Sequence, residues 1–203
     1  MDYHLHGDFC GHAEGTLEEY VLSAIAKGVT EIGFSAHLPL VTSPDPYHAM
    51  LEERLPDYVR LAGDLAGKYK DEITIRLGIE ADYFPGYESD TERLLKSAPF
   101  DYVLGAVHFL GDWHFTSMAG RERYKEMDPE TAFPAYFGQV ENLIESGLFD
   151  ILAHPDAIKK ENFRPLSDMT GHYSIIAGKL KERGMAIEAV SYTHLTLPTT
   201  PYV

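Results

Sequence analysis

Cysteine is nearly absent from this sequence, since Cys10 is the only one among 203 residues. A disulfide framework is therefore excluded within the chain, as is typical of proteins from a reducing compartment. The sequence also lacks an apolar run of about 20 residues, which a membrane-spanning helix requires. No basic stretch followed by an apolar one opens the chain, so no signal peptide is predicted. We therefore expect a cytoplasmic protein that does not bind membranes.

Positive charge is also scarce. The chain has 17 Lys and Arg against 32 Asp and Glu, which gives a formal net charge of −15 at pH 7. Nucleic acids and anionic membranes are bound by an excess of Lys and Arg, so neither is expected as a partner. A small anionic substrate remains compatible, because bound divalent cations reverse the sign of the local field. The sequence also lacks the P-loop, G-x-S-x-G and H-E-x-x-H motifs.

What the sequence does have is a series of apolar runs of strand length that each end on a possible metal ligand. They are Asp2–His6, Thr30–His37, Ile73–Glu80, Phe100–His108 and Phe149–His154. Helices are predicted between Thr16 and Gly28, and over Leu51–Tyr69, Tyr87–Ser97, Pro129–Ser146 and Thr170–Arg183, with a sixth strand over Met185–Glu188. This alternation predicts parallel βα units, in a barrel or an open doubly wound sheet. The barrel is favoured because nearly every strand supplies a ligand.

The carboxyl ends of parallel strands lie at one face of such a fold, where active sites are built. His4 and His6 are two residues apart on a strand, so both imidazoles point to the same side. His12 follows in a Gly-rich loop, and Glu80 ends an apolar strand where a buried carboxylate needs a partner. Imidazoles and a carboxylate that converge in this way are typical of a multinuclear metal site. We therefore predict a metal-dependent hydrolase.

Each of these residues also has a simpler structural interpretation. Glu80 could form an ion pair with Arg or Lys, and a single strand-end histidine could be a core residue. The shared placement of His37, His108 and His154 favours the metal site. Side chains without this placement are interpreted differently: His48 and His172 as surface residues, His114 as a surface or substrate-facing residue, and Cys10 as a buried, inert thiol.

The ordered motifs resemble one known family, the PHP (polymerase and histidinol phosphatase) superfamily. They are D-x-H-x-H-x5-H from Asp2 to His12, S-A-H at Ser35–His37, G-I-E at Gly78–Glu80, V-H-F at Val107–Phe109 and A-H-P-D at Ala153–Asp156. The similarity extends from Met1 to about Glu188. It is strongest to the monofunctional histidinol-phosphate phosphatases, through the segments GIEADYFPGYE and AHPDAIKK.

This resemblance implies a distorted (β/α)7 TIM-like barrel, here incomplete with about six βα units, and up to three divalent ions of Zn, Fe, Mn or Co. The implied ligands are His4, His6 and Glu80 for the first ion, Glu80, His108 and His154 for the second, and His12 and His37 for the third. Glu80, His108 and His154 are accordingly the expected catalytic residues, around a metal-bridging hydroxide that attacks phosphorus.

The activity implied by the resemblance is hydrolysis of L-histidinol phosphate to L-histidinol and phosphate, a step of histidine biosynthesis. The substrate would then be a small phosphate ester, and its amine and imidazole would suit an acidic outer pocket. The candidates for that pocket are Asp8, Asp45, Asp82 and Glu88. The alternatives are a PHP phosphoesterase acting on nucleotides or another small phosphate ester, and a non-catalytic PHP barrel.

The C-terminal part of the sequence departs from the family pattern. The family has a late Asp-x-His motif, which has no counterpart here because His194 lacks an Asp two residues before it. A phosphate-binding segment of the family is also missing from this sequence. From Val190 the sequence is uncharged and rich in Thr and Pro. We therefore expect residues 1–188 to form an incomplete PHP phosphatase domain and residues 189–203 to be a non-native tail. The chain itself is expected to be a poor enzyme.

Overall fold

The computed structural model describes residues 1–189, so the predicted tail lies outside the described residues except for Ala189. The described chain forms two compact units. The first consists of Met1–Ala81 and Asp90–Leu104, and the second of Asp82–Ser89 and Gly105–Ala189. Among the helices of this described part, none is both long and apolar enough to cross a membrane.

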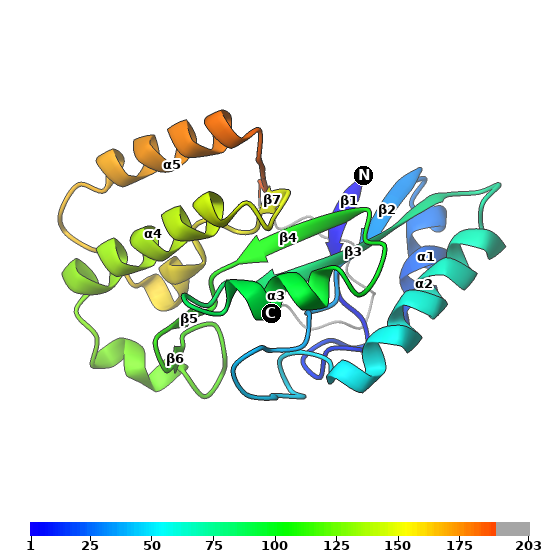
Figure 1. Ribbon diagram of the computed structural model, residues 1–203, viewed down its shortest axis with the longest axis horizontal. Helices are drawn as coiled ribbons and strands as arrows, with labels where there is room; N and C mark the ends of the chain where they lie inside the picture. The colour runs from blue at the N-terminus through cyan, green and yellow to red at the C-terminus, as the bar shows by residue number, and fades with distance from the viewer. Residues whose placement is uncertain (190–203) are drawn as a thin grey trace. The chain divides into compact units, whose positions relative to one another are not determined.

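The first unit is built from parallel βα units (Figure 1). Its elements are β1 (Asp2–Leu5), α1 (Leu17–Ala26), β2 (Glu31–Phe34), a 3-10 turn (Glu52–Arg54), α2 (Leu55–Lys68), and most of β3 (Thr74–Asp82), α3 (Glu88–Leu95) and β4 (Tyr102–Ala106). β1 pairs with β2, and β2 with β3, in parallel. This pairing confirms the predicted parallel arrangement.

The second unit continues the same alternation of strands and helices. Its elements are β5 (Phe109–Leu110), β6 (Trp113–His114), a 3-10 segment (Arg121–Lys125), α4 (Pro129–Ser146), β7 (Ile151–Leu152), a second 3-10 segment (Ala157–Asn162), α5 (Thr170–Arg183) and β8 (Ala186–Ile187). α4 packs against α5, as Figure 1 shows, and β7 pairs with β8 in parallel. The main sheet has the strand order β1-β2-β3-β4-β7-β8, while β5 and β6 form a separate antiparallel hairpin.

Local sequence signals determine where the helices begin and end. The predicted capping box is present at α1, where the Thr16 hydroxyl accepts from the Glu19 N–H and the Glu19 carboxylate accepts from the Thr16 N–H. α4 and α5 have the predicted bounds, and each ends at a glycine with positive φ, Gly147 at 70° and Gly184 at 64°. α2 begins four residues later than predicted, because a 3-10 turn precedes Pro56.

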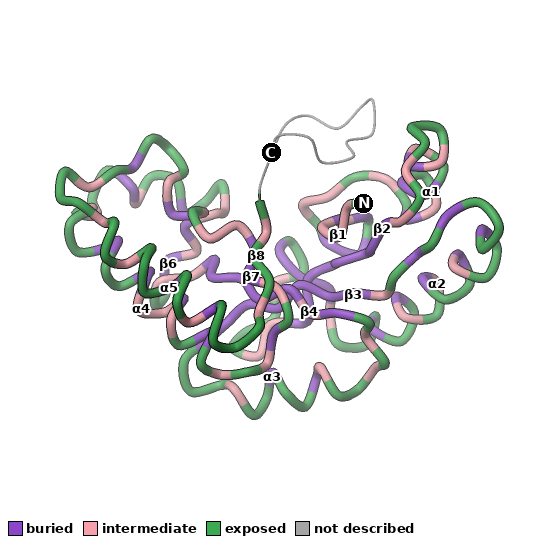
Figure 2. Tube along the Cα trace, turned by 90° about the horizontal axis from the view of Figure 1, so that it is seen from above, coloured by how far each residue is buried: buried purple, intermediate pink, exposed green. Residues whose placement is uncertain are grey.

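Buried positions run along β3 and β4, as the tube in Figure 2 shows, and recur on one side of helices such as α4. In the first unit, the ring of Tyr102 lies over two glycines on neighbouring strands, Gly33 of β2 and Gly78 of β3. Its hydroxyl is 2.7 Å from the carbonyl oxygen of Tyr3 and 3.0 Å from that of Phe34. Tyr102 therefore fills the space that side chains on these glycines would occupy and ties β1 and β2 together.

We expect the substitution Gly78→Ala to destabilise the fold. A Cβ at this position would lie 2.1 Å from Cζ of Tyr102, so the ring must move, at a cost of about 1–3 kcal/mol or more. The matched control is Gly63→Ala in α2, where no atom lies within 4 Å of the added Cβ and the helix should gain about 0.5–1 kcal/mol. Urea denaturation of both variants measures the difference. Equal stabilities would contradict this packing.

Candidate metal centre

The strand register of the first unit places Glu80 beside His37. The Leu38 N–H donates to the Glu80 carbonyl at 2.7 Å, and the Glu80 N–H donates to the Ala36 carbonyl at 3.1 Å. The chain after β2 therefore continues alongside β3, and the two residues face each other across a parallel bridge. The Glu80 side chain is 1% exposed. A carboxylate buried this deeply requires close polar partners.

Imidazoles provide those partners. The Glu80 Oε2 atom lies 3.0 Å from His4 Nε2, 3.1 Å from His6 Nε2 and 3.5 Å from His37 Nε2. The His4 and His6 Nε2 atoms are themselves 3.0 Å apart. Glu80 Oε2 and the Nε2 atoms of His4 and His6 are thus mutually close enough to surround one ion at ligand distances of about 2.0–2.2 Å. The group around Glu80 thus has the donor types and the spacing of a zinc-like site.

The protonation state of His6 suits this role. Burial lowers its pKa to about 4, although the neighbouring Glu80 carboxylate acts in the opposite direction. The ring is therefore neutral at pH 7 and offers a lone pair. A neutral imidazole is the form that binds metal ions.

Cys10 is a fully buried thiol that contacts His6 and His37. Its Sγ atom is 3.6 Å from His6 Nδ1 and accepts the His37 N–H at 3.1 Å. Burial raises the pKa of the thiol to about 12, so it stays protonated at neutral pH and differs from a thiolate ligand. The inert cysteine expected from the sequence is consistent with this environment. Through its contact with Nδ1, Cys10 helps to orient His6 with Nε2 toward Glu80.

His12 and His37 form a second group with His6. Their ring centroids are 4.7–5.2 Å apart, and one ring nitrogen from each lies within 4.8 Å of the others. His12 comes from the loop after β1, and His37 from the chain after β2. The structure therefore brings together all five predicted ligands of the first unit.

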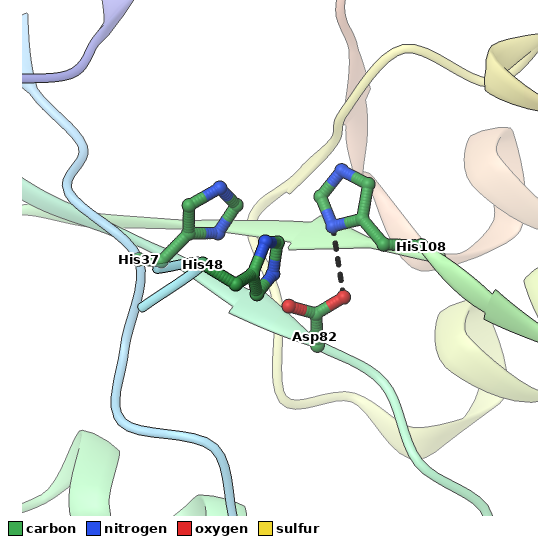
Figure 3. A group of neighbouring side chains, drawn as sticks. All are labelled: His37, His48, Asp82 and His108. Atoms are coloured by element: carbon green, nitrogen blue, oxygen red, sulfur yellow. Dashed lines mark hydrogen bonds and ion pairs between the residues drawn. The ribbon is translucent and has the colours of Figure 1, made fainter. Parts of the chain in front are cut away.

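His48 lies against His37 of this group, and its predicted surface position is wrong. The residue is 7% exposed, and its ring centroid is 4.1 Å from that of His37 and 6.1 Å from that of His12. Figure 3 shows the His48 ring beside that of His37. His48 lies in the loop between β2 and α2, so no strand pattern in the sequence indicates its burial.

The second unit contains a separate histidine pair. The Nε2 atoms of His108 and His154 are 3.3 Å apart, and His108 Nδ1 is 2.8 Å from Asp82 Oδ1, the contact dashed in Figure 3. A carboxylate that accepts the Nδ1–H of a histidine fixes the tautomer in which Nε2 carries the lone pair that binds a metal. Asp82 was a candidate for an outer pocket, but it is buried at the end of β3 and supports His108 instead.

His154 has an unusual backbone for a residue other than glycine, with φ at 22°. Its N–H donates to Glu188 Oε2 at 2.8 Å, which helps to hold this conformation. Strained backbone of this kind is common at functional sites. Glu188 follows β8, and its role was not anticipated from the sequence.

The two other described histidines pack on aromatic rings in the second unit. His114 stacks on Phe109, with ring centroids 4.1 Å apart. His172 stacks on Phe137, with ring centroids 5.1 Å apart. It is half-buried, whereas the sequence predicts a surface position. Stacking on an aromatic ring therefore accounts for the position of each of these two imidazoles.

Comparison with known proteins identifies the family. A probable histidinol-phosphatase from Deinococcus radiodurans is 37% identical over 159 residues, which are 78% of this chain and 61% of that protein. The histidinol-phosphatase of Bacillus subtilis is 34% identical over 117 residues, covering 54% of this chain and 44% of that protein. The chain therefore spans less than two thirds of the length of these curated relatives.

Solved structures agree with this result. One match is the crystal structure of histidinol phosphate phosphatase from Lactococcus lactis in complex with Zn, L-histidinol and phosphate. Its TM-score is 0.78 and its sequence identity 26%, and the match covers 93% of this chain and 72% of that chain. The predicted α/β fold of the TIM-like barrel type is thereby confirmed, here with six strands in its main sheet. The PHP domain family matches residues 2–191. The chain belongs to the PHP domain family.

Proposed function

We propose that this chain carries the metal ligands of a phosphomonoesterase that hydrolyses L-histidinol phosphate. The observation that carries the proposal is the Glu80 carboxylate, 1% exposed and approached by three imidazole nitrogens within 3.5 Å. The names of the relatives support the substrate, and the Lactococcus complex contains both the alcohol and the phosphate that such a reaction yields. We further propose a cytoplasmic location.

The proposed ligands follow the grouping within each unit. His4, His6 and Glu80 would hold one ion, and His12 and His37 would hold another. His108 and His154 would hold an ion in the second unit. That Glu80 also reaches this last ion remains a prediction from the family resemblance.

The charge of the chain supports a role for cations. A protein with a net charge of −15 repels a phosphate dianion unless positive charge is concentrated at the site. When bound, divalent ions would neutralise the phosphate and make a water molecule more acidic. The residues of the chain hold and orient the donors: Cys10 acts on His6, and Asp82 acts on His108.

We expect the zinc-loaded chain to release phosphate from L-histidinol phosphate in preference to a nucleoside monophosphate, and to leave single-stranded DNA intact. Removal of metal with EDTA should abolish the activity, and zinc should restore it. A preference for the nucleotide would instead support the alternative PHP phosphoesterase. Zinc binding without hydrolysis of any phosphate ester would support either a non-catalytic barrel or the poor activity expected of an incomplete domain. Absence of zinc binding would contradict the proposal itself.

A further inference from the structure

We propose that His48 is a further imidazole ligand for the ion at His12 and His37. This inference rests on the proposed metal-dependent function and deepens it at one position of the first unit. It concerns a residue in the loop between β2 and α2, outside every motif that the sequence indicated.

The loop that carries His48 is folded so that the imidazole points inward. The adjacent Tyr47 is 73% exposed, whereas His48 is 7% exposed. Asp45 fixes this turn, because its carbonyl accepts the His48 N–H at 3.0 Å and its side chain accepts the Tyr47 N–H at 3.0 Å. The polar imidazole is therefore buried against the rings of His37 and His12, while the larger Tyr47 ring stays outside.

A close backbone contact joins the loops of His12 and His48. A Cβ on Gly11 would lie 2.5 Å from the carbonyl oxygen of Pro46 and 2.9 Å from Cα of Tyr47. Only glycine therefore permits this approach. Because Gly11 precedes His12 and Tyr47 precedes His48, the contact sets the two imidazoles near each other, with 25° between their planes.

The spacing from His37 suits a shared ion. The two ring centroids are 4.1 Å apart with an interplanar angle of 36°, and a ring nitrogen of each lies within 4.8 Å of the other. Zinc sites in proteins usually have four ligands, of which His12 and His37 supply two. A further imidazole beside His37, with its ring centroid 6.1 Å from that of His12, would add a third donor to this set. Ring packing on His37 is the competing explanation, and it needs no nitrogen at all.

The variants His48→Phe and His48→Gln separate the two explanations. Phenylalanine keeps a ring on His37 but has no donor atom, while glutamine is polar but cannot replace the ring. We expect both to bind about one zinc ion fewer per chain, or to hold the weakest ion about tenfold or more less tightly. The control His172→Gln alters a stacked histidine of the second unit and should bind zinc like the wild type. Zinc is measured by competition with a chelating dye and by elemental analysis.

Normal zinc number and affinity in His48→Phe would overturn the inference and leave ring packing as the role of His48. If the wild-type chain bound no zinc, the proposed function itself would fail, which is a different result. Loss of the near-ultraviolet circular dichroism signal would show that the variants do not fold. In that case the wild-type protein is tested instead, by labelling its histidines with diethyl pyrocarbonate. Zinc should protect the His48 peptide and leave the His172 peptide unchanged. Equal labelling of His48 with and without zinc would also overturn the inference.

Discussion

Replacement of Glu80 by glutamine is expected to cause the largest loss of metal and activity. The carboxylate oxygen that lies 3.0 Å from His4 Nε2 and 3.1 Å from His6 Nε2 becomes part of a neutral amide. The amide keeps the shape of the side chain but provides no charge to balance a cation. We expect phosphate release to fall by more than the roughly 10–100-fold that loss of an indirect partner of a metal ligand causes. Elemental analysis and phosphate assays measure both effects.

Thermal unfolding distinguishes this loss from a folding defect. In EDTA the Glu80→Gln variant should be as stable as the wild type or more so, because a buried charge among imidazoles is removed. With zinc, the wild type should gain stability through binding, whereas the variant should gain much less. The control Glu92→Gln changes an exposed carboxylate in α3 that pairs with Lys96 and should behave like the wild type. An unchanged zinc content with normal turnover in Glu80→Gln would contradict the assignment.

Periodicity in the sequence accounts for the part of the site that could be predicted. The two-residue spacing of His4 and His6 places both rings on one side of β1, and the structure brings both to Glu80. The same rule could have identified Asp82, which follows Glu80 by two residues. The predicted strand ended at Glu80, whereas β3 continues to Asp82. One misplaced boundary thus assigned Asp82 to a loop.

His48 and the β5–β6 hairpin show the limit of this reasoning. His48 is buried because Gly11 allows two loops to meet, and a contact between loops distant in sequence has no periodic signature. The hairpin has strands of only two residues each, too short for a pattern to appear. The Gly111-Asp112 turn between them was its sole local signal, with φ of Gly111 at 61°.

The second large effect is expected from loss of His6 or His154, one in each unit. His6→Ala removes the nitrogen that lies 3.0 Å from His4 Nε2 and 3.1 Å from the Glu80 carboxylate. His154→Ala removes the nitrogen that lies 3.3 Å from His108 Nε2. We expect each variant to bind about one zinc ion fewer per chain and to release phosphate about 100-fold or more slowly.

The control for both is His172→Gln, because this ring is also half-buried but stacks on Phe137. Its loss should lower the thermal stability slightly and leave zinc content and turnover unchanged, since stacking contributes to packing alone. A double variant of His6 and His154 should lose about two zinc ions per chain, because the two imidazoles belong to different groups of ligands. If His172→Gln lost as much zinc as either alanine variant, proximity to other imidazoles would be a poor guide to metal binding in this chain. The assignment of His108 and His154 would then lose its basis, because it depends on the same argument from spacing.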